Sequence, residues 1–154
     1  MSQLESYSQA NASCMEHQIL EHLKRALRVT LEWKTPSVGL ARKVSSVQFT
    51  VKSFHRHLER VMNLEEVDGY MRAVAERKPY LDERLGKLRQ QHAEFRQRMG
   101  QLCPQLENAN ESEPDKFESL CRDVLSLLGE IDEHDREEIE ILQESMLSDE
   151  GGEG

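Results

Sequence analysis

The stretch from residue 40 to residue 65 carries the feature that most restricts the fold of this chain. Apolar residues recur there at alternating spacings of four and three, the repeat of one face of an α-helix. The repeat consists of Leu40, Val44, Val47, Val51, Phe54, Leu58 and Val61, and it ends on Glu65. The valines favour β-strands by propensity, but the 4-3 spacing persists over too many turns for that preference to decide. We therefore predict a long amphipathic helix that begins near Ser37 and buries one continuous stripe.

A first helix is predicted before it, from about Ser13 to Trp33. Ser13 and Glu16 have the spacing of a capping box, which satisfies backbone donors at a helix start. Pro36 limits the continuation of this helix, because the residue before a proline is pushed out of the helical region.

Two more helices follow an interruption at Asp68-Gly69 and a short helical connection over residues 70–78. The third helix carries Pro79 in its first turn and is predicted to stop at Cys103-Pro104. Its stripe is Leu85, Leu88, His92, Phe95, Met99 and Leu102. The fourth helix opens near residues 112–114, after a polar loop over 108–113. Its stripe is Phe117, Leu120, Val124, Leu127, Ile131, His134, Glu138 and Ile141.

Four amphipathic helices with short connections predict an all-α protein, an antiparallel up-down-up-down four-helix bundle. The composition agrees, because 37% hydrophobic and 32% charged residues suit helices with wide solvated faces. The length of 154 residues suits one domain. We expect a flexible N-terminus over residues 1–12, the bundle over 13–147, and a disordered acidic tail over 148–154.

Charge and cysteine usage exclude several classes of function. The net charge is −9 and the basic residues are spread among acids, so no nucleic-acid partner is expected. No apolar stretch reaches the length of a membrane span or signal peptide. The three cysteines, Cys14, Cys103 and Cys121, lack CxxC spacing and are interpreted as reduced thiols of a cytoplasmic protein. No residue pattern supports hydrolase or kinase chemistry, so a non-enzymatic role is favoured without being fixed.

Polar residues interrupt the apolar stripes at positions where a plain bundle would hold leucine or isoleucine. These residues are Glu65, His92, His134 and Glu138. An ionised carboxylate in a dry core costs several kcal/mol, roughly, unless it is paired or bound to a cation. Because the four lie on three helices, we expect them to converge on a shared partner. His134 and Glu138 stand four residues apart on one helix face, about 6 Å at their roots, and can reach one metal ion.

His17 adds a further imidazole on the first helix. It precedes Leu20, Leu27 and Leu31 at helical spacings, so it can also turn inward. Imidazole and carboxylate ligands without cysteine favour iron, manganese or zinc. Two metals bridged by carboxylates would leave open positions for oxygen, nitric oxide or peroxide.

The order of these residues resembles the hemerythrin-like (HHE cation-binding) domain family. The matching segments are Glu16-His17, Gln91-His92 with Phe95, His134 to Glu138, and Leu64 to Tyr70 followed by Pro79. The resemblance spans roughly residues 12–147. It implies a non-haem di-iron protein, with two irons per chain, that binds or senses oxygen, nitric oxide or iron.

The resemblance also implies a role for each candidate ligand. Glu65 and Glu138 would bridge the two irons. His17 would bind one iron, and His92 with His134 would bind the other. The family pattern places a second histidine four residues before Glu65, and this chain has Val61 there.

An alternative register uses His55 and Glu59, which also have the HxxxE spacing. It is disfavoured because Glu59 points about 110° from the centre of the second stripe, at 100° per residue. His55, His57 and Glu59 are interpreted instead as a partly solvated flank. The acid run Glu130, Asp132, Glu133, Asp135 and Glu137 is interpreted as a solvated helix face.

The missing histidine leaves two other hypotheses open. In one, the chain is a degenerate hemerythrin-like bundle without metal that acts as a structural or interaction protein, with no partner indicated. In the other, His92, His134 and Glu138 hold a single metal ion, such as zinc.

Overall fold

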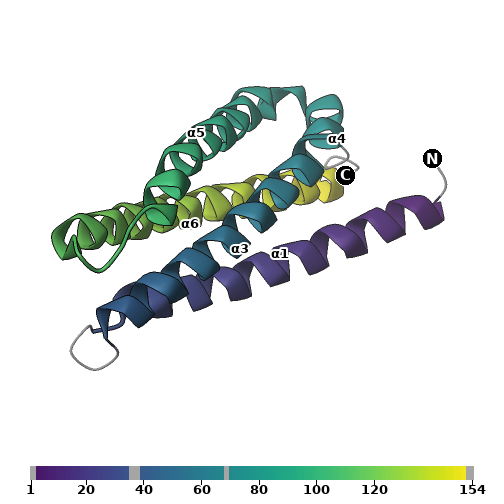
Figure 1. The fold of residues 1–154 in the computed structure, drawn as a ribbon. Coiled ribbons are helices and arrows are strands. Elements are labelled where there is room, and N and C mark those ends of the chain that lie inside the picture. Colours follow the sequence, from purple (N-terminus) through teal and green to yellow (C-terminus); the bar gives the residue numbers. More distant parts are fainter. Residues whose placement is uncertain (1–2, 35–38, 68–69, 152–154) are drawn as a thin grey trace.

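The computed structural model describes residues 3–34, 39–67 and 70–151, and the side chains of 14–34, 39–67 and 70–147. Within these ranges the chain is helical and contains no strand, which confirms the predicted all-α class. The four long helices are α1 (Gln3–Glu32), α3 (Leu40–Val67), α5 (Asp82–Glu107) and α6 (Pro114–Gly151) (Figure 1). The short helix α4 (Tyr70–Arg77) and the 3₁₀ turn η1 (Pro79–Leu81) lead from α3 to α5.

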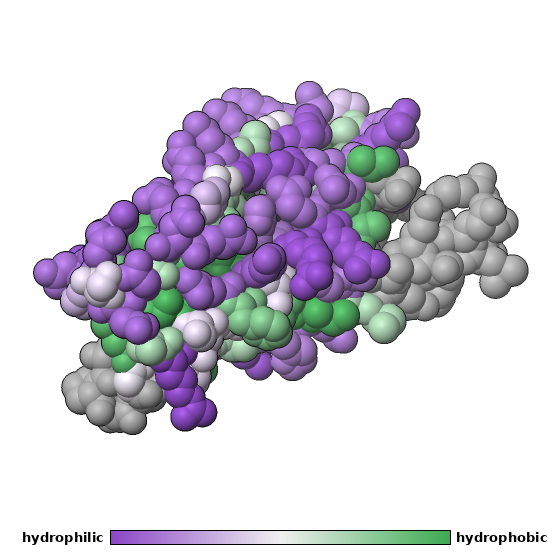
Figure 2. Space-filling model, viewed as in Figure 1, coloured by the Kyte–Doolittle hydropathy of each residue, from purple (hydrophilic) through white to green (hydrophobic). Residues whose placement is uncertain are grey.

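The long helices pack side by side. α1 lies along α3 over much of its length, and α5 packs against both α6 and α3 (Figure 1). The start of α1, the short helix α4 and the end of α6 lie toward the same end of the molecule (Figure 1). On the face drawn in Figure 2, hydrophilic side chains cover most of the helices and apolar ones show in small groups between them. None of the helices in the described ranges combines the length and apolarity needed to cross a bilayer.

Both terminal helices are longer than predicted. α1 begins at Gln3 and not near Ser13, and α6 continues to Gly151, so each extends into a segment predicted to be flexible or disordered. Residues 3–12 and 148–150 contain neither proline nor glycine, so nothing in the sequence terminates these helices earlier. The predicted interruption at Asp68-Gly69 lies outside the described residues. The expected connection after it is confirmed as α4.

The prediction that the third helix stops at Cys103-Pro104 is wrong. α5 runs on to Glu107 with Pro104 inside it, and the Asn108 amide donates to the Pro104 carbonyl at 3.1 Å. A proline removes one amide donor, and the carbonyl that loses it belongs to Gly100. Gly100 is exposed, so water can take that carbonyl, and the added turn buries Leu106 in the core.

Two apolar clusters form the interior. The main core contains most of the predicted stripes, including Phe54, Phe95, Phe117 and Ile131. A smaller end core lies where α4 meets α5 and α6, and consists of Met71, Val74, Leu81, Leu85, Leu88 and Ile141. Along α5 and along α6, the inward-facing polar residues fall between the parts that contribute to these two cores. The interior is therefore divided by a polar layer.

A buried lysine ties α1 to α6 next to this layer. The Lys24 side chain is 2% exposed, and its Nζ lies 2.7 Å from Asp132 Oδ1 and 3.1 Å from Asp135 Oδ2. Glu21 on α1 approaches the same ammonium at 3.0 Å. Asp132 and Asp135 were predicted to belong to a solvated face, and this prediction is wrong, because both are only partly exposed and both pair across helices.

Candidate metal centre

Four of the five predicted ligands lie together in the polar layer. Glu65 comes from the last turns of α3, His92 from the middle of α5, and His134 with Glu138 from α6. All four are buried, with exposed fractions between 1% and 5%. One ligand atom from each lies within 4.8 Å of the others, so the four residues can hold a metal ion.

The distances between the donor atoms suit ligands of one cation. His92 Nε2 lies 3.1 Å from His134 Nε2 and 3.3 Å from Glu65 Oε2. His134 Nε2 lies 3.4 Å from Glu138 Oε2. Two atoms bound at about 2.1 Å to a tetrahedral ion are separated by roughly 3.4 Å. These three contacts thus have the spacing of neighbouring ligands in one coordination shell, and all four donors lie within 4.8 Å of one another.

Both imidazoles are held with Nε2 facing this shell. His92 Nδ1 is bonded to Glu66 Oε1 at 2.9 Å, and His134 Nδ1 is bonded to Gln91 Oε1 at 2.6 Å. Since both partners accept, each Nδ1 carries the proton and donates it. Such a bond fixes the ring and, in a neutral histidine, leaves the Nε2 lone pair available to a metal.

His17 lies on the other side of the two glutamates. Its Nε2 is 2.7 Å from Glu65 Oε1 and 3.5 Å from Glu138 Oε1. Each glutamate therefore turns Oε1 toward His17 and Oε2 toward the α5 and α6 histidines. This is the arrangement of a carboxylate that can bridge two ions. The His17 side chain is 35% exposed, so this side is nearer to solvent than the buried ring of four.

Two carboxylate oxygens in the layer lack hydrogen bonds. Glu65 Oε2 and Glu138 Oε2 are fully buried, and no described residue is aligned to donate to either. Each lies within ion-pair distance of a histidine Nε2, but outside hydrogen-bond geometry. Buried carboxylate oxygens without donors are costly, and both of these face the space that the four ligand atoms surround. The residues present therefore fit a cation.

The charges of the layer are coupled. Burial alone would lower the pKa of His92, but the Glu65 and Glu66 carboxylates outweigh it and hold that pKa above its ordinary value. Burial would raise the pKa of Glu138, but His134 and His17 hold it below its ordinary value. A divalent cation could replace the protons that stabilise these carboxylates when no metal is bound.

Tyr70, in the first turn of α4, also reaches this layer. Its hydroxyl is buried and no described residue is in hydrogen-bond geometry with it. Burial and the negative charges of Glu138 and Glu65 raise the pKa of Tyr70 strongly. The phenol thus lies within electrostatic reach of both carboxylates, and Glu138 is near it without being aligned for a good hydrogen bond.

The structure separates the two registers considered for the second helix. Val61 is 3% exposed and belongs to the main core, one turn before Glu65. His55 contacts Cys103, and Glu59 pairs with Arg96 at 3.2 Å, so neither joins the cluster of four. Glu65 is therefore the α3 residue that meets the other ligands, and its expected histidine partner is absent.

His57 is partly exposed, as predicted for a partly solvated flank, and it also pairs across helices. Its side chain is 15% exposed, and its Nε2 lies 2.6 Å from Glu16 Oε2 on α1. Glu16 was predicted to cap the start of the first helix. Because α1 continues through that region, Glu16 instead joins α1 to α3.

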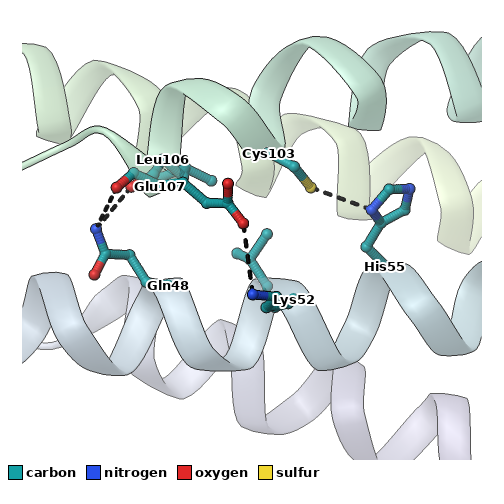
Figure 3. A pocket seen from close by; sticks show the side chains of 7 residues that line it. Gln48, Lys52, His55, Cys103, Leu106 and Glu107 are labelled. Carbon is teal, nitrogen blue, oxygen red and sulfur yellow. Dashed lines mark hydrogen bonds and ion pairs between the residues drawn. The ribbon is translucent and has the colours of Figure 1, made fainter.

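A hollow between α3 and α5 lies apart from the polar layer (Figure 3). It has a volume of about 140 Å³ and is lined by Gln48, Val51, Lys52, His55, Cys103, Leu106 and Glu107. Cys103 Sγ lies 3.4 Å from His55 Nδ1. Burial, with the nearby charge of Glu107, raises the pKa of the Cys103 thiol to about 11. The thiol therefore stays protonated near neutral pH and is a poor nucleophile or metal ligand.

Sequence reasoning missed the residues that orient the ligands. Glu66 and Gln91 each neighbour a predicted ligand in sequence, and Arg96 binds Glu66 through Nη2 at 2.8 Å. Burial opposes it, but Arg96 and His92 hold the pKa of Glu66 below its ordinary value. Glu66 and Gln91 each stand next to a stripe residue, but the ligand that each one orients lies on another helix, so only the packing of the helices reveals these bonds.

No protein-family model, curated protein or solved structure matches this chain. The hemerythrin-like resemblance therefore stays a prediction from the residues quoted for it. What the geometry shows is narrower: the buried cluster of Glu65, His92, His134 and Glu138 can hold a metal ion.

Proposed function

We propose that this chain is a non-haem iron-binding protein of the hemerythrin type, built as an up-down-up-down bundle. It holds iron in the polar layer and binds or senses a small diatomic molecule such as oxygen or nitric oxide, or iron itself. The observation that carries this proposal is the ring of four buried donors at the spacing of one coordination shell. Its two imidazoles present Nε2 inward because their Nδ1 atoms are engaged elsewhere.

The residues divide between two neighbouring positions. His92 and His134, with the Oε2 atoms of Glu65 and Glu138, would hold one ion. His17, with the Oε1 atoms of the same glutamates, would hold a second. Bound iron would supply open coordination positions for a diatomic ligand.

The surrounding residues keep the site ordered and dry. Gln91 and Glu66 fix the two imidazole rings, and Arg96 balances the charge of Glu66. The main core and the end core lie on either side of the layer, and its four clustered ligands are buried. Low polarity around the ring strengthens each charge interaction within it.

The donor chemistry supports iron over softer metals. Nitrogen and carboxylate oxygen donors without thiolate suit iron, manganese or zinc, and exclude copper(I) or an iron–sulfur cluster. The described cysteines do not belong to the cluster. We assign iron from the resemblance, and manganese or zinc would be distinguished by metal analysis.

Metal analysis of the purified chain tests the proposal. Protein made in iron-supplemented medium is analysed by mass spectrometry, and metal-free protein is titrated with iron(II) without air, then exposed to air and scanned in the near ultraviolet. We expect up to two irons per chain and new charge-transfer absorption. His134→Gln with Glu138→Gln should lose both, whereas the matched control His22→Gln with Glu133→Gln, at exposed positions on α1 and α6, should keep both. A folded chain that refuses iron would overturn the proposal.

A second candidate function is a metal-free helical scaffold. The observation that favours it is the burial of Val61 in the main core, where the resemblance requires a ligand. In that case the histidines and glutamates serve one another as ion pairs. The same titration separates the two functions, since the scaffold would show no saturable uptake of iron, manganese or zinc.

A further inference from the structure

We propose that Tyr70 is a direct ligand of the iron, bound through its phenolate oxygen. This inference rests on the proposed function and deepens it, because it names a donor that lies outside the predicted set of five. Three features of the structure carry it: the place of Tyr70, the state of its hydroxyl, and the shortage of donors in the layer.

Tyr70 lies on the side of the polar layer that faces the end core, away from the main core. Its ring packs against the end core, which contains Leu88 on α5 and Ile141 on α6. Leu88 lies one turn before His92, and Ile141 lies one turn after Glu138. Tyr70 packs against this end core, and its interactions with Glu138 and Glu65 place its hydroxyl near the ligand ring.

The hydroxyl of Tyr70 has no well-aligned hydrogen-bond partner among the described residues, although Glu138 lies close to it. It is fully buried, and it neither donates nor accepts a hydrogen bond with a described residue. A buried tyrosine hydroxyl normally finds a partner, because an unsatisfied polar group costs about 1–3 kcal/mol. In the same layer Glu65 Oε2 and Glu138 Oε2 are also without donors. An ion held by Glu65 and Glu138 would also give the nearby Tyr70 oxygen a partner.

The hemerythrin-like resemblance implies one more imidazole than the layer holds, because Val61 stands at that position. A phenolate is a hard, anionic oxygen donor, which suits iron(III) and adds a negative charge that imidazole does not. On binding, the phenolic O–H bond breaks, the oxygen bonds to iron, and the proton passes to solvent. A bound cation favours this step in the same way that it deprotonates a coordinated thiol or water.

The test is spectroscopic and uses the full chain. Metal-free protein is loaded with iron(II), oxidised in air, and examined by visible absorption and resonance Raman scattering. The wild-type chain should show a phenolate-to-iron(III) charge-transfer band and enhanced tyrosinate ring vibrations. Tyr70→Phe should lose both signals and bind iron about 10- to 100-fold more weakly, the range typical of residues that support a metal site. The matched control is Tyr80→Phe, at a position 60% exposed, which should keep both signals.

The other outcomes distinguish a failure of the Tyr70 ligand from a failure of the proposed iron-binding function. If the wild-type chain takes up iron but shows no tyrosinate vibrations, Tyr70 is not a ligand, while the proposed function stands. The same holds if Tyr70→Phe keeps the signals. If the chain takes up no iron at all, both inferences fail together. Because the wild-type Raman spectrum decides the first case alone, the test does not depend on Tyr70→Phe folding.

Discussion

Replacing the buried Lys24 by methionine should destabilise the metal-free chain. The substitution keeps the length and apolar stem of the side chain and removes only the ammonium. Asp132 and Asp135, three residues apart on α6, then lose the cation that lies 2.7 Å and 3.1 Å from them. These ion pairs join α1 to α6, two helices distant in sequence. Their loss should therefore weaken the packing of α1 against α6.

The magnitude follows from how much water each carboxylate can reach. Removing one partner of a fully buried ion pair costs about 3–5 kcal/mol. Here Asp132 is 31% exposed and Asp135 is 35% exposed, so water can solvate part of each stranded charge, although burial outweighs Lys24 and holds the pKa of Asp135 above its ordinary value. Screening at exposed positions reduces such energies toward about 1 kcal/mol or less. We therefore expect Lys24→Met to lower the free energy of unfolding by about 1–3 kcal/mol.

The pH dependence has a defined sign. Burial lowers the pKa of Lys24, but Asp132, Asp135 and Glu21 outweigh it, so the folded pKa lies above the ordinary 10.5. A raised lysine pKa gives stability that is fully present below about 10.5 and is lost as pH rises through the higher folded value. The pKa of Asp132 is lowered, because Lys24 and Arg28 outweigh its burial. The stability that ionised Asp132 contributes is present above its ordinary pKa of 3.8. It is lost as the pH falls through the lower pKa of the folded state.

Urea denaturation followed by far-ultraviolet circular dichroism measures the effect at neutral pH and at about pH 3, the latter near the ordinary pKa of aspartate. Arg28→Met is the matched control, because Arg28 also pairs with Asp132 but is 33% exposed. It should cost less than about 1 kcal/mol. The difference between wild type and Lys24→Met should persist at neutral pH and shrink in acid. Equal stability of Lys24→Met and wild type at neutral pH, or a more stable variant, would refute the reasoning.

Three further predictions concern the polar layer. The double substitution His134→Leu with Glu138→Leu should raise the free energy of unfolding of the metal-free chain by up to about 1–4 kcal/mol and remove any rise in Tm on adding iron; a less stable metal-free variant would contradict this. Val61→His should lower the free energy of unfolding of the metal-free chain by about 1–3 kcal/mol, because it puts a larger polar group in a packed core. The same substitution should increase the iron bound per chain in a metal titration. Unchanged uptake would show that position 61 does not face the metal. Gln91→Leu should weaken iron binding about 10- to 100-fold, because it frees the His134 ring. The control Gln90→Leu, at the exposed neighbouring position, should leave the affinity for iron unchanged. Equal affinities of the two variants would show that the bond from His134 to Gln91 does not orient the histidine.

Periodicity predicted the helices and the ligand ring together, because both depend on which face of a helix is buried. Glu65, His92, His134 and Glu138 each stood in an apolar stripe, and the structure buries all four within reach of one another. Helix ends were predicted less well. The helix α5 continues past Pro104 because its last turn buries Leu106 in the core. Local sequence rules do not reveal the stabilisation that comes from this tertiary burial.

Lys24 shows how a sequence interpretation can miss a buried charge. Leu20, Lys24, Leu27 and Leu31 continue the 4-3 spacing, so the lysine stood in the stripe and was inward-facing by position. Lysine is rarely buried without partners, so its position in the stripe does not by itself predict burial. Its partners, Asp132 and Asp135, lie on α6, and only the packing of α1 against α6 reveals them.

Charge balance links the ring of four to Tyr70. One divalent cation neutralises Glu65 and Glu138 while the imidazoles stay uncharged, so a single ion leaves the buried ring without net charge. A second divalent ion beside His17 would leave two positive charges in a mostly buried layer, and oxidation to iron(III) would add more. Such charge is costly in a low-dielectric interior unless an anion accompanies it. Tyr70 lies within electrostatic reach of both glutamates and could supply that anion on losing its proton. Loading with zinc, which has no redox chemistry, should therefore depend less on Tyr70 than loading with iron in air does.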